Sequence, residues 1–253
     1  MKQLDRNFVF IHVPKAGGTS VTEILFALMD DVYPREKLLN YPLFSDIEPP
    51  TKYSLFISHF GYSFYRGSGG YCMSVMRDPV ERVLSLFSYW KNPGKGMPPG
   101  DPLPEGMTLD EFLSSDRQDI WTNIRNAQTW QIAFGLDVKT RHRFERIQWY
   151  ELFDIARANI DRMHVVGVIE SPEHFLAQLE ELFPDKPKMK LERFNPSTDR
   201  TLAADIPSET LDRIRSMTEL DAKLYAYAAS LADRRFIDII HNRLYSRRKP
   251  AEL

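Results

Sequence analysis

The segment best suited to bind an anion follows a short apolar run near the N-terminus and reads PKAGGTS over residues 14–20. Its paired glycines let the backbone wrap closely around a charged group. The helix expected after them offers unbonded N–H groups and the positive end of its dipole. Lys15 adds a mobile positive charge, and the hydroxyls of Thr19 and Ser20 add hydrogen-bond donors. The pattern therefore predicts a phosphate-binding loop.

This loop differs from a Walker A loop in the position of its lysine. A Walker A loop places the lysine directly before the Ser or Thr that holds Mg²⁺. Here Lys15 precedes both glycines, and Gly18 stands where that lysine would be. The order counts against an ATP-using kinase, which remains the alternative enzyme. A simple Gly-Gly turn with a solvated Lys15 is the structural alternative.

A second basic motif follows the first by some sixty residues and reads RDPVERVLS over residues 77–85. Arg77 comes at the end of a predicted strand, where open parallel sheets bind their ligands. Pro79 opens a helix, and Ser85 lies two turns into it. A guanidinium and a hydroxyl in this arrangement can hold a second phosphate group. A surface ion pair between Arg77 and Asp78 is the alternative interpretation.

Apolar runs rich in β-forming residues predict the strands, and helical spacing with capping residues predicts the helices. The expected strands cover residues 8–13, 53–58, 71–76 and 163–169. The first expected helix is capped by Thr19 or Ser20, the second covers residues 79–90, and a short third one opens with a capping box at 108–111. Three more helices are expected over residues 120–134, 151–162 and 171–183. In the C-terminal part, one helix is expected to start at residue 208, another at residue 218, and a last one to cover 233–247. The expected loops are 33–52, 63–70, 92–106 and 186–207, of which 92–106 could close over a substrate. This order predicts a three-layer α/β fold with a central parallel sheet and a helix-rich C-terminal half.

Composition limits the class of protein further. The chain has 253 residues, with 33 Lys and Arg against 35 Asp and Glu, so we expect a single domain over residues 1–253. The nearly balanced charge disfavours a nucleic-acid-coating protein but permits a local basic pocket. The lone Cys72 excludes an internal disulfide framework and fits a reducing compartment. No apolar run approaches the roughly 20 residues of a membrane span, so we expect a protein of the cytoplasm.

Together the two motifs resemble those of the PAPS-dependent sulfotransferases, in particular the carbohydrate group that includes heparan sulfate 2-O-sulfotransferase. PAPS is 3′-phosphoadenosine 5′-phosphosulfate. The family's phosphosulfate loop is similar to residues 10–20, and its 3′-phosphate motif is similar to residues 75–82 with the serine at Ser85. Weaker similarity continues through residues 126–128, 165–167 and 220–225.

The resemblance implies a P-loop-like fold, PAPS as co-substrate, no metal, and an acceptor hydroxyl on a carbohydrate or another molecule. It implies that Arg77 and Ser85 bind the 3′-phosphate. It also implies that the phosphosulfate end is bound by the first loop, namely by Lys15, Ala16, Gly17, Gly18, Thr19 and Ser20. A non-catalytic nucleotide- or glycan-binding module is the alternative from another class.

Transfer of a sulfuryl group needs a base and a group that meets the charge of the leaving phosphate. Lys15 is the candidate for the group that stabilises the negative charge of the leaving phosphate. His59, which follows the second strand, is the candidate base, because an imidazole in water titrates at about pH 6.5. Related 2-O-type enzymes read His-x-His here, whereas this chain lacks the upstream histidine. Glu23 is the rival base, and His12 is expected to be structural.

The acceptor side is less specified by the sequence. The tryptophans that could stack on a sugar, or equally belong to the core, are Trp121, Trp130 and Trp149. The polar residues that could line the cleft or meet an acidic acceptor are Asn126, Gln128, Arg141, His142 and Arg143. Arg193 and Asn195 could close over the nucleotide.

Overall fold

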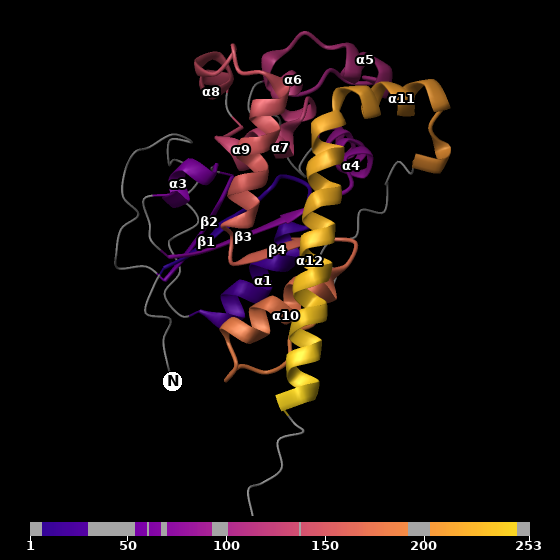
Figure 1. Cartoon of the computed structure of the whole chain (residues 1–253). Coiled ribbons are helices and arrows are strands. Elements are labelled where there is room, and N and C mark those ends of the chain that lie inside the picture. The colour runs from indigo at the N-terminus through magenta and orange to yellow at the C-terminus, as the bar shows by residue number, and fades with distance from the viewer. Residues whose placement is uncertain are drawn as a thin grey trace, which may run out of the picture.

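The computed structural model describes residues 7–29, 54–59, 61–66, 70–92, 101–136, 138–191 and 203–246. The described elements form a central sheet with helices on both of its faces (Figure 1). The expected loop over residues 33–52 lies outside the described residues, as do the parts of two other expected loops at 93–100 and 192–202.

The described residues form one sheet whose neighbouring strands are all parallel. Its strands are β1 (Phe8–Ile11), β2 (Leu55–Ser58), β3 (Tyr71–Met76) and β4 (Val165–Val168), in the spatial order β2-β1-β3-β4. Each lies within an expected strand. The strands are mainly apolar along their whole length because helices cover both faces of the sheet. The predicted central parallel sheet is confirmed.

Side chains of β1 alternate between the two faces, as the period of a strand requires. Phe8 and Phe10 pack with helices α1 and α10, whereas Val9 and Ile11 pack with α7, α9 and α12. These helices are α1 (Gly18–Leu28), α10 (Pro172–Leu182), α7 (Ala127–Ala133), α9 (Trp149–Asp161) and α12 (Glu219–Ser246). In Figure 1, α1 and α10 lie below the strands, and α7 and α9 lie above them. The three-layer arrangement is therefore confirmed.

A third cluster of apolar side chains joins the helices that lie beyond the sheet. They are α4 (Pro79–Lys91), α5 (Leu109–Ser114), α6 (Gln118–Ile124) and α11 (Ser208–Met217). The capping box expected at the start of α5 is present, since the Thr108 hydroxyl accepts from the Glu111 N–H while the Glu111 carboxylate accepts from the Thr108 N–H. Asp78 caps α4 in a similar way, with Pro79 in its first turn.

The single helix predicted over residues 120–134 is wrong, because the chain breaks it into α6 and α7. The break lies at Asn126, which has φ of 48°. Its backbone N–H donates to the carbonyl of Met217, 3.1 Å away, instead of continuing a helix. A contact with a distant segment therefore overrides the local helical pattern.

Three further predictions need correction. The separate last helix expected over 233–247 is part of α12, whose 28 residues contain no Gly or Pro to interrupt them. The turn expected over 63–70 contains a short helix, α3 (Tyr62–Arg66), with Tyr62 buried in the core and the Tyr65 hydroxyl donating to Gly70 O. A short helix, α8 (Val138–Arg143), was not expected at all.

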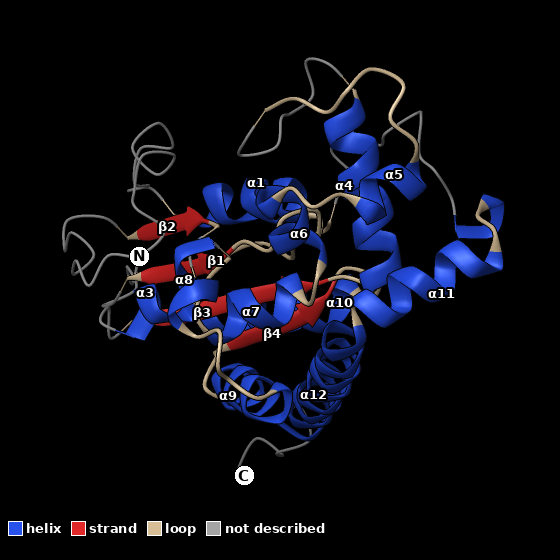
Figure 2. Ribbon diagram, turned by 90° about the horizontal axis from the view of Figure 1, so that it is seen from above, coloured by secondary structure: helices blue, strands red, loops and turns tan. Residues whose placement is uncertain are grey.

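The strand order creates one preferred place for a ligand. The chain passes from β1 to its neighbour β2 on one side and then crosses to β3 on the other side. In open parallel sheets the crevice at such a reversal, beyond the carboxyl ends of the strands, is where ligands bind. Here those ends lead into His12 after β1 and Arg77 after β3. Figure 2 shows the strand arrows pointing to this common edge.

Two helices that begin near each other cap each other's N-terminus. The Asp221 carboxylate of α12 accepts from the N–H groups of Gln128 and Thr129, at 3.2 and 2.7 Å, in the first turn of α7. In return the Asn126 side-chain oxygen accepts from the N–H groups of Leu220 and Asp221, at 2.9 and 3.3 Å. Burial raises the pKa of the Asp221 carboxyl, whereas the positive charge of Arg82 and these hydrogen bonds oppose that shift. This exchange fixes the start of α7.

We predict that Asp221→Ala lowers the free energy of unfolding by about 3–5 kcal/mol, because it leaves two buried N–H groups without their acceptor and removes the negative charge that stabilises the buried Arg82. Urea denaturation measures the change. Glu219→Ala is the matched control, since this carboxylate lies in the same helical turn but is exposed and pairs with the exposed Lys223. The control should change stability by no more than about 0.5 kcal/mol. Equal effects of the two substitutions would contradict the capping role.

Candidate functional site

The loop after β1 turns sharply into α1. Lys15 has φ of 67° and Gly17 has φ of 74°, so the backbone enters the left-handed region twice within three residues. Gly17 is the N-cap of α1, and no side chain caps this helix. The expectation that Thr19 or Ser20 caps the helix is therefore wrong, because both lie in its first turn. The N–H groups of that turn face away from the helix body, as an anion-binding terminus requires.

Both glycines of the loop are in close contact with neighbouring side chains. A methyl group on Gly17 would lie 2.5 Å from Ile169 Cδ1. A methyl group on Gly18 would overlap the imidazole ring of His12. The absence of side chains thus lets β1, the strand end of β4 and the start of α1 meet.

Arg77 joins the second motif to this loop. Its Nη1 donates to the carbonyl of Lys15 at 3.0 Å, and its Nη2 lies 3.4 Å from the Glu81 carboxylate. The side chain is only 14% exposed. The Gln128 side chain brackets the backbone of Arg77, accepting from its N–H at 3.1 Å and donating to its carbonyl at 2.8 Å. The two motifs that were predicted separately therefore form one site.

Arg82 is a structural part of the site that sequence reasoning missed. It is fully buried, and its guanidinium donates to the carbonyls of Pro14, at 3.3 Å, and Asn123. Burial lowers the pKa of Arg82 to about 10, while the carboxylate of Asp221 opposes that shift. The only sequence signal is an arginine at i+4 from Asp78, directly before the buried Val83 and Leu84. Through its hydrogen bond to Pro14, Arg82 holds the start of the phosphate loop in place.

One face of α4 presents three further polar side chains near the second motif. Glu81, Ser85 and Tyr89 are spaced four residues apart, so they lie on one side of the helix. Glu81 pairs with Arg77 at one end of this row. At the other end, the Lys15 ammonium lies 3.6 Å from the centre of the Tyr89 ring. Ser85 therefore lies between the partners of the two basic residues.

His59 and His12 lie side by side because they follow neighbouring strands in register. Ile11 pairs with Ser58, so the next residue of each strand faces the other. The ring centres are 4.6 Å apart, and His59 Nδ1 is 2.8 Å from the carbonyl of His12. A carbonyl only accepts, so Nδ1 carries the proton and neutral His59 keeps a lone pair on Nε2. A second histidine, absent from the local sequence pattern, thus comes from the adjacent strand.

His12 is fixed from several sides. Its ring stacks on Phe10, with centres 5.5 Å apart, and lies over Gly18. Its carbonyl accepts from Gln131 Nε2 at 3.0 Å as well as from His59. Its structural role was expected. Glu23, the rival base, is exposed on α1.

The residues expected on the acceptor side differ in burial. Trp121 is 39% and Trp149 57% exposed, whereas Arg141 is buried, with its guanidinium 5.1 Å from the Trp121 ring and 4.9 Å from the Trp130 ring. Burial lowers the pKa of Arg141 to about 9. Asn126 and Gln128 are also buried, and His142 and Arg143 are exposed. Arg193 and Asn195 lie outside the described residues.

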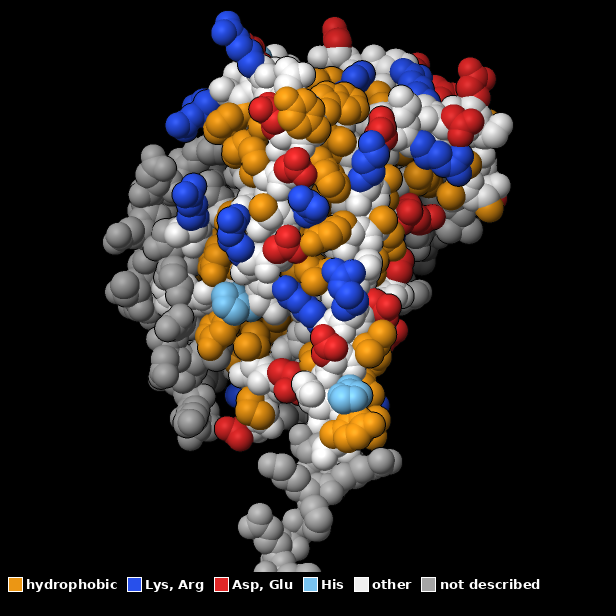
Figure 3. All heavy atoms as spheres, viewed as in Figure 1, with side chains coloured by type: hydrophobic (Ala, Val, Ile, Leu, Met, Phe, Trp, Pro, Cys, Tyr) orange, Lys and Arg blue, Asp and Glu red, His pale blue; other side chains and the backbone are white. Residues whose placement is uncertain are grey.

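On the molecular face in Figure 3, the basic and acidic side chains of the described residues are interspersed over the helices. This mixture agrees with the chain's near-neutral charge, a net −2. The positive charges that converge on the phosphate loop come from two motifs instead, through Lys15 and Arg77.

Comparison with known proteins bears on this arrangement. A family model described as "Sulfotransferase family" matches residues 3–228. A curated relative, heparan-sulfate 6-O-sulfotransferase 1-B of Danio rerio, is 24% identical over 188 residues. The match covers 66% of this chain and 44% of the relative, so the chain spans less than half of the relative's length. Within the described residues, no helix is both long enough and apolar enough to cross a bilayer.

We predict that Gly18→Ala separates the two histidine rings, because the added methyl group must displace the imidazole of His12. Alanine is favoured in a helix by about 1 kcal/mol, but the overlap should lower the free energy of unfolding by about 1–3 kcal/mol instead. Imidazole NMR resonances of His12 and His59 report the displacement. Gly106→Ala is the control for the imidazole resonances, since nothing lies within 4 Å of its added methyl group; its φ of 78° strains an alanine, so it is no control for the free energy of unfolding. Unmoved resonances in Gly18→Ala would contradict the packing described above.

Proposed function

The chain belongs to the sulfotransferase family, and we propose that it transfers a sulfuryl group from PAPS to a hydroxyl group of a carbohydrate. The observation that carries this proposal is the convergence of the Lys15 loop, Arg77 and His59 at the carboxyl ends of neighbouring strands. The relative supports the choice of acceptor, since it is named for a carbohydrate. It is named for 6-O rather than 2-O transfer, so the match supports the carbohydrate group without favouring the 2-O subtype.

The site suits a ligand with two separate phosphate-type groups. The start of α1 with Lys15 would hold the phosphosulfate end, since a helix terminus and an ammonium both stabilise negative charge. Arg77 and Ser85, on the strand end and the neighbouring face of α4, would hold the 3′-phosphate. Because these groups lie on two elements, the loop before α1 and the strand end with α4, they support a donor that carries two phosphate-type groups, such as PAPS. The family match does not favour the alternative kinase.

PAPS supplies the sulfuryl group: the bond from sulfur to its 5′-phosphate oxygen breaks while the acceptor oxygen bonds to sulfur. The acceptor hydroxyl must lose its proton in the same reaction, and we assign that proton to His59 Nε2. The hydrogen bond from Nδ1 to the His12 carbonyl supports this, because it leaves the lone pair of the neutral ring on Nε2. Among the described residues, Glu23 is exposed on α1 and makes no hydrogen bond that would direct it to the loop in the same way.

Lys15 would meet the negative charge that develops on the leaving phosphate. Its ammonium rests on the Tyr89 ring, a contact worth only about 0.5–1 kcal/mol when exposed, so a phosphate can draw it away. The carbonyl of the same residue is held by Arg77. The backbone of the loop thus stays in place while the side chain moves.

We also propose that the protein works in the cytoplasm. Cys72 is buried and unpaired by any disulfide, which fits a reducing compartment. It stays a prediction.

The proposal predicts a loss of turnover in His59→Ala of at least about 10²-fold, with binding of 3′-phosphoadenosine 5′-phosphate retained, because the base acts on the acceptor and not on the donor. His241→Ala is the matched control, since this histidine is exposed near the C-terminal end of α12. The assay is mass spectrometry of a mixed pool of carbohydrates incubated with PAPS, which detects the added SO₃ group.

Two results would contradict parts of the proposal. Turnover that survives His59→Ala and falls in Glu23→Gln would assign the base to Glu23. Donor binding without sulfation of any acceptor in a broad pool would favour the non-catalytic binding module instead.

A further inference from the structure

The ring of Tyr89 holds the ammonium group of Lys15, the lysine of the phosphate loop. The ammonium lies 3.6 Å from the ring centre, whereas the other cation–ring contacts between described residues measure 4.9–6.0 Å. At the shorter distance the charge is in direct contact with the electron-rich face of the ring. The side chain that is expected to meet the leaving phosphate therefore has a second partner within the protein.

The place where Tyr89 holds this charge suits a cation. Tyr89 lies in the last turn of α4, at the negative end of the helix dipole, which stabilises positive charge. Its half-buried ring also packs against the third apolar cluster, the one that joins α4, α5, α6 and α11. The ring is thus held in place, and the flexible lysine side chain is the partner that can leave the contact.

The place expected for the phosphosulfate is the end of another helix. At the start of α1, unbonded N–H groups and the positive end of the dipole favour an anion and disfavour a cation. Lys15 is connected to both places. Its backbone lies in the loop before α1, with its carbonyl bonded to Arg77, while its ammonium reaches Tyr89 on α4. The ammonium therefore has two alternative partners, an anion at α1 or the ring on α4.

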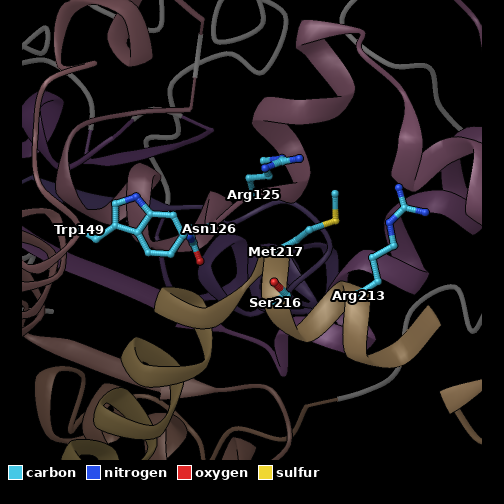
Figure 4. Close-up of a pocket in the computed structure, with 6 residues that line it drawn as sticks. All are labelled: Arg125, Asn126, Trp149, Arg213, Ser216 and Met217. Carbon is cyan, nitrogen blue, oxygen red and sulfur yellow. The ribbon is translucent and has the colours of Figure 1, made fainter. Parts of the chain in front are cut away.

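The pocket drawn in Figure 4 offers a comparison. It has a volume of about 320 Å³ and lies at the break between α6 and α7, with Arg125 among its lining residues. The Arg125 guanidinium lies 5.8 Å from the centre of the Trp121 ring. None of the residues that line this pocket belongs to either phosphate motif. An exchange between a ring and a phosphate is therefore expected for Lys15 and not for Arg125.

We propose that Tyr89 is a positioning residue that competes with the bound nucleotide for the Lys15 ammonium and so speeds release of the product. The identity of that nucleotide, 3′-phosphoadenosine 5′-phosphate, rests on the proposed function. After the transfer, its 5′-phosphate keeps the electron pair of the broken bond to sulfur, so it attracts Lys15 more strongly than the donor did. A second partner for the ammonium offsets part of this attraction. Release of the product limits the turnover of many enzymes.

Titration calorimetry with 3′-phosphoadenosine 5′-phosphate measures the competition. Tyr89→Leu should bind this nucleotide about two- to fivefold more tightly than the wild type, because its Lys15 has no ring to leave. Stopped-flow displacement should show that the dissociation rate constant falls by a similar factor. A substitution that only damaged the site would weaken binding instead, so the direction of the change identifies the role.

Further variants separate the attraction of the ring for the cation from its packing. Tyr89→Phe keeps the aromatic face and should bind the nucleotide like the wild type. In a Lys15→Met background, Tyr89→Leu should no longer change the affinity, since the competition needs the ammonium. If Tyr89→Leu does not fold, replacement of Tyr89 by 4-cyanophenylalanine keeps a ring but withdraws electrons from its face, and it should tighten binding as well. Tyr150→Leu, which removes a 67% exposed ring from α9, is the matched control and should leave the affinity unchanged.

The outcomes that contradict the inference differ from those that contradict the proposed function. Equal or weaker nucleotide binding in a folded Tyr89→Leu variant would overturn the inference. Weaker binding that persists in the Lys15→Met background would show instead that the ring contacts the nucleotide itself, as a surface on which adenine stacks. Both results leave the proposed donor intact, because the wild type still binds the nucleotide. Failure of the wild type to bind 3′-phosphoadenosine 5′-phosphate would reject the proposed function and this inference with it.

Discussion

The hydrogen bond from the Arg77 guanidinium to the Lys15 carbonyl connects the parts on which the site depends. It joins the end of β3 to the loop after β1, and so brings together two motifs that are separated by some sixty residues of chain. A charged donor on a carbonyl contributes more than a neutral one, and this guanidinium is mostly shielded from water. The carbonyl points to Arg77 because Lys15 has a left-handed backbone, which turns the loop toward α1.

Buried polar groups behind this bond keep both of its ends in place. Gln128 brackets the backbone of Arg77, and Asp221 caps the helix that carries Gln128. Arg82 holds the loop through Pro14. A buried network of this kind is costly when one member is missing and rigid when all are present. Because the network is rigid, the backbone of Lys15 stays fixed while its side chain moves.

Much of this could be predicted from the sequence, because local patterns determine it. Short apolar runs predicted the strands. Arg77 and the loop that begins at Pro14 come directly after two of these predicted strands, so their convergence followed from the parallel sheet. The break at Asn126 could not be predicted, since the N–H that ends the helix bonds to Met217, more than ninety residues away. The buried role of Arg82 and the pairing of His12 with His59 likewise depend on which elements become neighbours.

One site of this protein should bind two separate phosphate groups of its donor. Titration calorimetry in EDTA, comparing 3′-phosphoadenosine 5′-phosphate with adenosine 5′-phosphate, tests this most directly. We expect the 3′-phosphate to increase the affinity by about tenfold or more, the effect of a charge-assisted hydrogen bond, without any metal. The gap should narrow in Ser85→Ala. Equal affinity for the two nucleotides, or binding that requires Mg²⁺, would contradict it.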